Sequence, residues 1–464
     1  MFSVVIKTKN DEYKNTYDKK ILLSDALKNA GIYHDHPCGG KGTCKKCSVT
    51  ANGKKVLSCM TYIDSDTIVD YTSEAEDIVG IVFSKTAQQK LNPILDSGYG
   101  MAVDIGTTTL AGYVYKFPEG NCVKSIGLPN LQKSHGADVI SRIEFQSRGG
   151  KNTLMEELHQ QIKNLSEGYD ISKYIITGNT TMLHFMEGLD ASGIAKAPFT
   201  PKSLFGMWKD NIYYPGCISS YIGADITTAI IASGMMDDKV SFLVDIGTNG
   251  EMVINNNGKL LCCATAAGPA FEGANISSGM LSVSGAINKV YIDGEKVRYT
   301  TIGDTKPIGI CGTGLIDAVA CMLKLGVIDE SGYLEDDFVI GDSGISITPS
   351  DIRQLQIAKS AIRSGIDTLL EKSKITYTEL EKFYIAGGFG SFINKESAAA
   401  IGLIPTEVLD KAEVIGNGAG AGACMLLLNR DFIKKSEEIA EEAETIELSN
   451  DEFFINSYME NMMF

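Results

Sequence analysis

The sequence predicts a small α+β domain followed by a larger α/β unit built from two similar lobes. Two observations support this organisation. Four of the eleven cysteines lie close together, between Cys38 and Cys59, in the first part of the chain. Further on, the stretch Val-Asp-Ile-Gly-Thr occurs twice, beginning at Val103 and Val244, and a repeat at a spacing of about 140 residues indicates an internal duplication. With 464 residues, the chain is also too long for a single hydrophobic core.

The composition excludes some classes of partner. No apolar run reaches the roughly 18 residues that a membrane-spanning helix requires, and the first residues alternate like a strand and lack a small-residue cleavage site. We therefore expect a cytoplasmic protein with no membrane partner. The net charge of -16 repels phosphate backbones, so nucleic acid is not an expected partner.

The first domain, residues 1–75, reads as a series of short elements. Strands are expected at 2–7, 17–22 and 67–71, with a helix at 24–30 that begins at the N-cap Ser24. A glycine-rich loop and a hairpin turning at Asn52-Gly53 lie between that helix and the last strand. This order suits a β-grasp fold.

The loop and hairpin carry four candidate metal ligands: Cys38, Cys44, Cys47 and Cys59. An iron–sulfur cluster needs four thiolates that converge on one compact centre, and three ligands from a tight loop plus one from a hairpin supply them. Glycines at 39, 40 and 42 let the loop approach inorganic sulfide closely. The pattern resembles the plant-type two-iron ferredoxins, which implies a 2Fe-2S cluster, although five residues rather than four separate the first two cysteines.

Two other interpretations of this region stay open. A C-x2-C pair near two further cysteines can also form a zinc site, but such sites usually combine two C-x2-C pairs. Five lysines and no acidic residue lie between His36 and Ile63. They form either a solvated face or a patch that attracts an acidic partner to the cluster. The remaining seven cysteines lie among apolar residues and are expected to be core thiols.

Residues 76–98 end in Pro and Gly and are expected to be a linker. Both Val-Asp-Ile-Gly-Thr stretches then read as an apolar strand, a tight turn and a second strand. Each copy has a later companion in which a strand runs into a small-residue turn and a helix, at 174–182 and at 383–391. The expected units are lobe I at 99–240, lobe II at 241–430, and a C-terminal helix and tail at 431–464.

Two such hairpins resemble the actin-like superfamily of sugar and acetate kinases and chaperones, in which they grip nucleotide phosphates across a cleft. The resemblance implies ATP and Mg²⁺ as ligands, with Asp104 and Asp245 near the hydrated cation. Asp225 either orients water near the terminal phosphate or is a surface acid. The implied phosphate contacts are Gly106, Thr107, Thr108, Thr109, Gly247, Thr248 and Asn249. The implied adenosine contacts are Gly387, Gly388 and Gly390, with Gly312 and Gly314 as a further wall.

Two other features of the sequence allow weaker interpretations. One Asp-Ile-Gly-Thr turn alone could be a simple turn capped by its own acid, but two in the same context favour a nucleotide site. Residues 416–421, Gly-Asn-Gly-Ala-Gly-Ala, loosely fit a dinucleotide-binding fingerprint. No second strand with a ribose-binding acid follows, so these glycines are interpreted as allowing close helix packing.

A ferredoxin joined to an actin-like ATPase resembles the reductive activators of corrinoid enzymes. Further stretches share this resemblance: Asn130-Leu-Gln132, Gly136–Arg142, Ala267–Glu272, Asp351–Lys359 and Ile401–Pro405. Larger members have an extra domain between ferredoxin and ATPase. Because only about 25 residues separate the two units here, we expect a short form that lacks the middle domain.

The resemblance implies a repair reaction, in which one electron returns an inactive Co(II) corrinoid to Co(I) with the help of ATP. The implied partners are a corrinoid protein of a methyltransferase system and a low-potential donor of the ferredoxin or flavodoxin type, and a homodimer is left open. Two other classes remain. Activators of radical dehydratases also combine an actin-like ATPase with electron injection, but they hold a four-iron cluster between subunits. A small-molecule kinase or a nucleotide-gated redox sensor is the second alternative, although no catalytic base for a kinase is evident.

Overall fold

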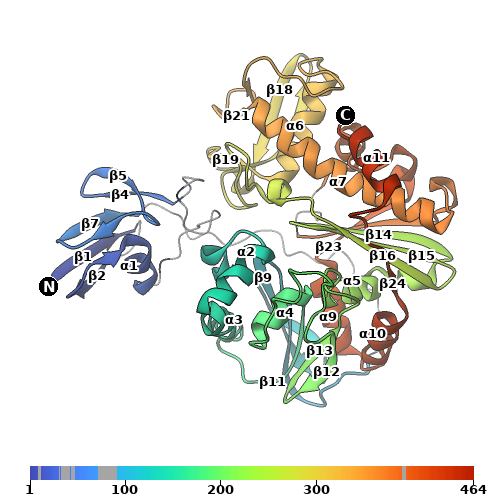
Figure 1. The fold of residues 1–464 in the computed structure, drawn as a ribbon, viewed down its shortest axis with the longest axis horizontal. Coiled ribbons are helices and arrows are strands. Elements are labelled where there is room, and N and C mark those ends of the chain that lie inside the picture. The colour runs from blue at the N-terminus through green and yellow to red at the C-terminus, as the bar shows by residue number, and fades with distance from the viewer. Residues whose placement is uncertain (9–11, 31, 33–41, 43–46, 72–90, 389–392) are drawn as a thin grey trace.

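The computed structural model describes residues 1–8, 12–30, 32, 42, 47–71, 91–388 and 393–464. A small N-terminal domain, residues 1–71, lies beside a larger two-lobed body (Figure 1). Of the predicted site residues, Cys38, Cys44 and Gly390 lie outside the described residues. Within the described part, no helix combines the length and apolar character needed to cross a membrane.

The N-terminal domain is a five-stranded sheet in the order β2-β1-β7-β4-β5. Strand β1 pairs in parallel with β7 and antiparallel with β2. Its alternating pattern buries Val4 and Ile6 against Leu23 and Leu27 of helix α1. The helix begins one residue earlier than predicted, and Ser24 lies in its first turn rather than at the N-cap. The elements are β1 (Phe2–Lys7), β2 (Glu12–Tyr17), β3 (Ile21–Leu22), α1 (Leu23–Asn29), β4 (Ser48–Ala51), β5 (Lys54–Leu57), β6 (Tyr62–Ile63) and β7 (Thr67–Asp70).

Lobe I is built on a six-stranded sheet in the order β10-β9-β8-β11-β13-β12. The first three strands form an antiparallel meander, and β11 pairs in parallel with β8. The strands are β8 (Gly98–Ile105), β9 (Thr109–Phe117), β10 (Asn121–Pro129), β11 (Ile171–Gly178), β12 (Phe205–Lys209) and β13 (Ile212–Gly216). The helices are η1 (Leu131–His135), α2 (Val139–Phe145), η2 (Gln146–Gly150), α3 (Lys151–Leu165), α4 (Thr180–Met186), α5 (Ala224–Ser233) and η3 (Met235–Asp237).

Lobe II repeats this topology on a sheet in the order β23-β22-β14-β15-β16-β24. Here too an antiparallel meander comes first, and β22 pairs in parallel with β14. The predicted duplicated α/β fold is therefore confirmed. The strands are β14 (Val240–Ile246), β15 (Gly250–Asn256), β16 (Lys259–Thr265), β22 (Lys382–Ala386), β23 (Ala412–Gly416) and β24 (Glu444–Thr445). The helices are η4 (Pro269–Glu272), α6 (Gly312–Lys324), α7 (Pro349–Ser373), η6 (Tyr377–Glu379), α8 (Lys395–Ala400), η8 (Thr406–Lys411), α9 (Gly418–Leu428), α10 (Asp431–Glu442) and α11 (Glu452–Glu460).

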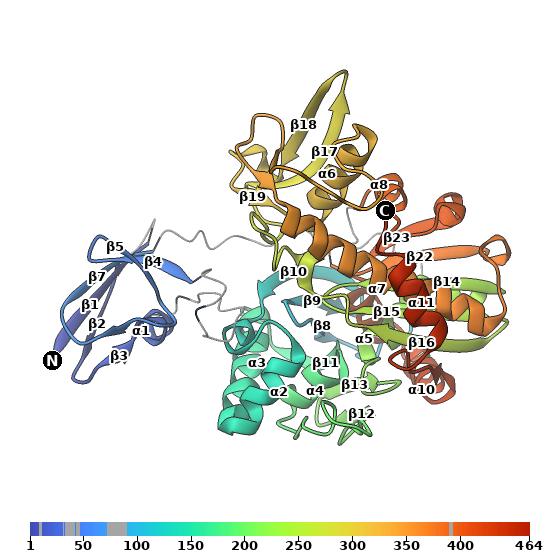
Figure 2. The ribbon, with the colours of Figure 1, turned by 45° about the horizontal axis from the view of Figure 1, so that its top comes forward.

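A smaller subdomain, formed by the part of the chain that follows β16 and precedes α7, projects from lobe II (Figure 2). Its three-stranded sheet has the order β18-β17-β19, and α6 packs its apolar face against β17. The elements are β17 (Ala286–Asp293), β18 (Lys296–Thr301), η5 (Ile302–Asp304), β19 (Gly309–Ile310), β20 (Phe338–Val339) and β21 (Ser346–Ile347).

The two lobes share one apolar core around the helices α5 and α9. That core combines Ala102 and Tyr113 from lobe I with Leu243 and Tyr384 from lobe II. A Cβ at Gly422 of α9 would lie 2.0 Å from the carbonyl oxygen of Thr228 on α5, so only glycine allows this close packing. Within the segment 416–421, a Cβ at Gly418 would lie 3.2 Å from the Cβ of Ala229 on α5, which agrees with the interpretation of these glycines as helix-packing residues.

The C-terminal end of α9 holds the segment that enters lobe I. The backbone N–H of Asn92 donates to Leu428 O at 3.1 Å, and that of Ile94 donates to Leu427 O at 3.3 Å. Arg430 completes the contact, since its backbone N–H donates to Asn92 O and its guanidinium donates to Pro93 O at 2.6 Å. Helix α9 is therefore hydrogen-bonded to the start of the body.

Candidate functional site

The two predicted hairpins face one cleft between the lobes. Each closes with a backbone hydrogen bond: Gly106 N–H donates to Thr109 O at 3.0 Å, and Gly247 N–H donates to Asn249 O at 2.9 Å. The cleft contains about 1220 Å³ of space free of protein atoms, part of it open to solvent. The predicted residues that line it are Asp104, Gly106, Thr107, Thr108, Thr109, Asp225, Asp245, Gly247, Thr248, Asn249, Gly312, Gly387 and Gly388.

Two of the glycines are required by close backbone approach. A Cβ at Gly106 would lie 2.7 Å from Thr109 O, across the hairpin turn. Gly387 has a φ of +109°, and a Cβ there would lie 2.3 Å from the carbonyl oxygen of Ile246. Both turns therefore need glycine, which leaves the backbone accessible to a ligand in the cleft.

Carboxylates gather at the base of the cleft. Burial, with the charge of Asp225 as a smaller cause, raises the pKa of Asp104 to about 7. Burial and the charges of Asp225, Asp104 and Glu272 raise the pKa of Asp245 to about 8. Burial also raises the pKa of Asp225, to about 6, and that of Glu251 well above its usual range. A divalent cation would relieve this crowding of negative charge, because it favours the ionised carboxylates.

The described lining residues include no lysine or arginine. Phosphate groups would therefore be held by backbone N–H groups, hydroxyls and a cation. The buried hydroxyl of Thr248, in the second hairpin, has no hydrogen-bond partner within the described part of the chain. A buried hydroxyl in this state is suited to bind a ligand oxygen.

Some residues differ from the prediction or were missed by it. Gly314 does not line the cleft: it faces β17, and a Cβ there would lie 2.2 Å from Ile287 O. Among the lining residues that were not assigned from sequence, four carry a carboxylate or amide side chain: Asn179, Glu251, Glu272 and Asn417. Two of them share a signal, since β11 ends at Gly178 and β23 ends at Gly416, and the following Asn caps the next helix in both cases.

Glu272 connects the two lobes across the cleft. The hydroxyl of Thr108, in the first hairpin, donates to the carboxylate of Glu272, in lobe II. A Cβ at Gly247, in the second hairpin, would lie 3.6 Å from Glu272 Oε1. One carboxylate therefore lies against both hairpins, where a phosphate held between them would meet it.

Two members of the predicted cluster ligand set lie in the described part of the N-terminal domain. The sulfur atoms of Cys47 and Cys59 are 3.1 Å apart, and both residues are buried. They project from the start of β4 and the turn after β5. Two adjacent thiols of this kind are close enough to bind one iron atom, so these residues fit a cluster.

The fold and the cleft define an actin-like ATPase fold preceded by a small α/β domain. Comparison with known proteins then identifies the family. The model described as the RACo middle region matches residues 99–238, and the model described as the C-terminal domain of RACo, the ASKHA domain, matches residues 239–464.

Whole-chain relatives agree with these matches. The corrinoid activation enzyme RamQ of Eubacterium limosum is 30% identical, over 96% of each chain. The [Co(II) methylated amine-specific corrinoid protein] reductase of Methanosarcina barkeri is 27% identical, over 78% of this chain and 76% of that one. A solved structure, titled reductive activator for corrinoid,iron-sulfur protein, superposes with a TM-score of 0.73 and 27% identity, covering 100% of this chain and 98% of that one. The chain belongs to the RACo family and is a corrinoid activation enzyme, a reductase of Co(II) corrinoid protein.

The comparisons correct one prediction. The chain is not a short form without the middle domain, because the RACo middle-region model matches residues 99–238. The sequence pattern predicts that the ATPase begins at the first Asp-Ile-Gly-Thr hairpin and that a middle domain, where present, precedes it. In this chain the matched middle region itself contains that hairpin, between β8 and β9.

Proposed function

We propose that this enzyme returns a Co(II) corrinoid protein to Co(I) by passing one electron through its N-terminal domain, with ATP bound in the cleft between the lobes. The observation that carries the proposal is the presence, on one chain, of a four-cysteine loop and hairpin and of two phosphate hairpins facing one cleft. The electron comes from a low-potential donor of the ferredoxin or flavodoxin type, and the partner is the corrinoid protein of a methyltransferase system.

In the N-terminal domain, Cys38, Cys44, Cys47 and Cys59 would hold a 2Fe-2S cluster. When bound, such a cluster supplies a one-electron donor with a reduction potential of about -400 mV. The equilibrium constant for the transfer falls tenfold for about every 59 mV by which the reduction potential of the acceptor is more negative than that of the cluster. An energy source is therefore needed for a more negative Co(II)/Co(I) couple.

In the cleft, the backbone N–H groups of both hairpins and the hydroxyls of Thr107, Thr108, Thr109 and Thr248 would bind the phosphates. Asp104 and Asp245, one from each lobe, would hold a hydrated Mg²⁺ between them, and Asp225 would position water. The Gly387-Gly388 turn would face the adenosine. Because the ligands come from both lobes, nucleotide binding and hydrolysis change the closure of the cleft.

The test is an anaerobic assay with the chemically reduced protein, ATP and a Co(II) corrinoid protein, following the Co(I) absorption band. Cys47→Ser and Cys59→Ser should abolish both the visible cluster spectrum and Co(I) formation. Cys122→Ser is the matched control, because this cysteine is exposed on lobe I, outside the predicted ligand set. If Co(I) forms without ATP, or in the two ligand variants, the proposal is wrong.

A further inference from the structure

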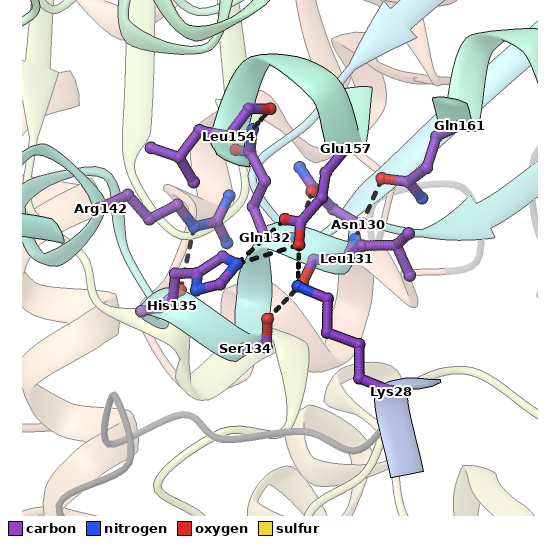
Figure 3. Close-up of polar contacts among 11 residues, drawn as sticks. Lys28, Asn130, Leu131, Gln132, Ser134, His135, Arg142, Leu154, Glu157 and Gln161 are labelled. Atoms are coloured by element: carbon purple, nitrogen blue, oxygen red, sulfur yellow. Dashed lines mark hydrogen bonds and ion pairs between the residues drawn. The ribbon is translucent and has the colours of Figure 1, made fainter. Parts of the chain in front are cut away.

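An ion pair joins the N-terminal domain to lobe I (Figure 3). Lys28, in the last turn of α1, places its Nζ 2.5 Å from Glu157 Oε1 on α3. His135 Nε2 lies 3.1 Å from both carboxylate oxygens of the same Glu157. The ring of His135 stacks on Phe145, with ring centroids 4.1 Å apart. Glu157 therefore contacts Lys28 of the N-terminal domain and the imidazole of His135 in lobe I.

Glu157 is a nearly buried carboxylate rather than an ordinary surface acid. Its side chain is only 10% exposed, whereas that of Lys28 is 39% exposed. Burial acts to raise the pKa of Glu157, but the hydrogen bonds and charges of His135 and Lys28 outweigh burial and lower it. A nearly buried carboxylate that stays ionised needs such partners, and one of them is supplied by the other domain.

The same part of lobe I supports the first phosphate hairpin. The segment from Asn130 to Arg142 lies between α3 and the hairpin. Asn130 donates through its backbone N–H to Thr108 O at 2.9 Å and through Nδ2 to Gly106 O at 2.8 Å. The buried Arg142 donates through Nη2 to Thr107 O at 2.7 Å and through Nε to Gly136 O at 2.9 Å. Three successive hairpin carbonyls are thus held by the segment that carries His135.

This segment is also tied to the helix that carries Glu157. Gln132 Nε2 donates to Leu154 O at 2.8 Å, and Leu131 N–H donates to Gln161 Oε1 at 3.1 Å. The buried Oε1 of Gln132 has no hydrogen-bond partner among the described atoms. An unsatisfied buried acceptor has a free-energy cost, so a second arrangement of this segment that satisfied it would gain stability.

We propose that Glu157 and His135 form a docking site for the N-terminal domain, and that filling the cleft with nucleotide weakens this docking through the segment 130–142. In the present arrangement the Thr108 hydroxyl donates to Glu272 across the cleft. A phosphate that takes over this hydroxyl displaces the hairpin whose carbonyls hold Asn130 and Arg142. The docked domain and the bound nucleotide therefore favour different positions of one segment, and each lowers the affinity for the other by the same factor.

The strength of the contact suits a reversible dock. A single ion pair is a weak interaction, but two domains on one chain meet at an effective concentration on the order of millimolar. A weak contact is then close to balance between docked and released states, so that a small change at the hairpin shifts the populations. Release would leave the N-terminal domain able to approach a corrinoid protein. This step and the binding of nucleotide in the cleft rest on the proposed function, whereas the docking contact does not.

Docking is tested on the full-length protein, with its cluster and without corrinoid protein, by small-angle X-ray scattering and by hydrogen exchange of α1 and α3. Lys28→Glu and Glu157→Lys should each enlarge the radius of gyration and speed exchange in both helices, and the double exchange should restore the wild-type values. Lys28 is partly exposed, so its variant should fold even if Glu157→Lys does not. Lys19→Glu, an exposed site on the same domain, is the matched control. Unchanged scattering and exchange in Lys28→Glu would overturn the dock.

The link to the cleft is tested with Mg²⁺ and the nonhydrolysable analogue AMPPNP. Adding them to the wild type should enlarge the radius of gyration, and Lys28→Glu should bind the analogue about fivefold more tightly than the wild type or Lys19→Glu. If Lys28→Glu is undocked but binds the analogue with the same affinity as the wild type, the coupling between nucleotide and docking is wrong, whereas the docking contact itself still stands. If no variant binds the analogue, the nucleotide part of the proposed function is wrong, whereas the docking measurements keep their meaning.

Discussion

Glu272→Gln should separate nucleotide binding from nucleotide hydrolysis. The carboxylate of Glu272 accepts the Thr108 hydroxyl and lies against the second hairpin at Gly247. A terminal phosphate held between the hairpins would be close to this negative charge. The amide keeps the shape of the side chain and removes only its charge and its ability to accept a proton. We expect tighter binding of Mg²⁺-AMPPNP and slower hydrolysis of ATP.

The size of both effects follows from this geometry. Two unit charges about 5 Å apart, at an effective dielectric constant of about 20, interact by about 3 kcal/mol. A bound Mg²⁺ cancels much of this repulsion, so that roughly a tenfold decrease in Kd remains, or about 1.4 kcal/mol. We expect kcat to fall by about 10²- to 10⁴-fold, because Glu272, beside the terminal phosphate, would accept the proton of the water that Asp225 positions.

The assay combines calorimetric titration of Mg²⁺-AMPPNP with steady-state phosphate release from ATP. Glu441→Gln, at an exposed position on α10, is the control and should match the wild type in both measurements. A variant that binds more tightly but hydrolyses normally would show that Glu272 only repels the phosphate. Weaker binding together with unchanged kcat would refute the reasoning altogether, because it would mean that Glu272 is not near the terminal phosphate.

Three further predictions concern the same cleft. Chelation of Mg²⁺ should weaken ATP binding at least about 100-fold but leave adenosine binding unchanged, since carboxylates and no described lysine or arginine line the cleft; equal ATP affinity in titrations with and without EDTA would contradict this. The raised pKa values of Asp104 and Asp245, about 7 and 8, mean that the folded state keeps protons that the unfolded chain has lost above about pH 4. These two carboxyl groups should therefore lower the free energy of unfolding of the nucleotide-free protein as the pH rises from about 4 to 8. Thermal unfolding of Asp104→Asn should show a weaker dependence on pH. Mg²⁺-AMPPNP should then stabilise more at about pH 8 than at about pH 6, because the cation replaces the protons. Gly387→Ala should weaken Mg²⁺-AMPPNP binding about tenfold or more, because the new Cβ would lie 2.3 Å from the carbonyl oxygen of Ile246. Gly326 is the control, since it also has a positive φ but has open space around it. Gly326→Ala should lower the free energy of unfolding by about 1 kcal/mol and leave binding unchanged.

The hairpins could be predicted from sequence because their conformation is set locally. An apolar strand, an acid, a tight Gly-Thr turn and a second strand lie within a few residues, and the repeat of this pattern gave the topology of both lobes. Glu272 could not be placed in the same way. Glu272 is the last residue of the short helix η4, after β16, and it reaches the cleft only because the lobes pack around α5 and α9.

Asn179 and Asn417 could have been found by a closer comparison of the two halves. Each follows a glycine at the end of a parallel strand and caps the next helix, so the duplication places both at equivalent points of the cleft. The middle region was mistaken for a missing domain for a related reason. A local motif shows where a phosphate hairpin begins, but it does not show to which conserved region of a family the surrounding lobe belongs.

Helix α9 has a mechanical consequence for the whole molecule. Its N-cap, Asn417, lies in the cleft, and its last residues are hydrogen-bonded to Asn92 and Ile94, where the chain from the N-terminal domain joins the body. Eleven helical residues span about 16 Å, and this rod is almost entirely enclosed by both lobes. A tilt of its cleft end about the glycine contact with α5 would therefore move the hydrogen-bonded residues Asn92 and Ile94 in the opposite direction.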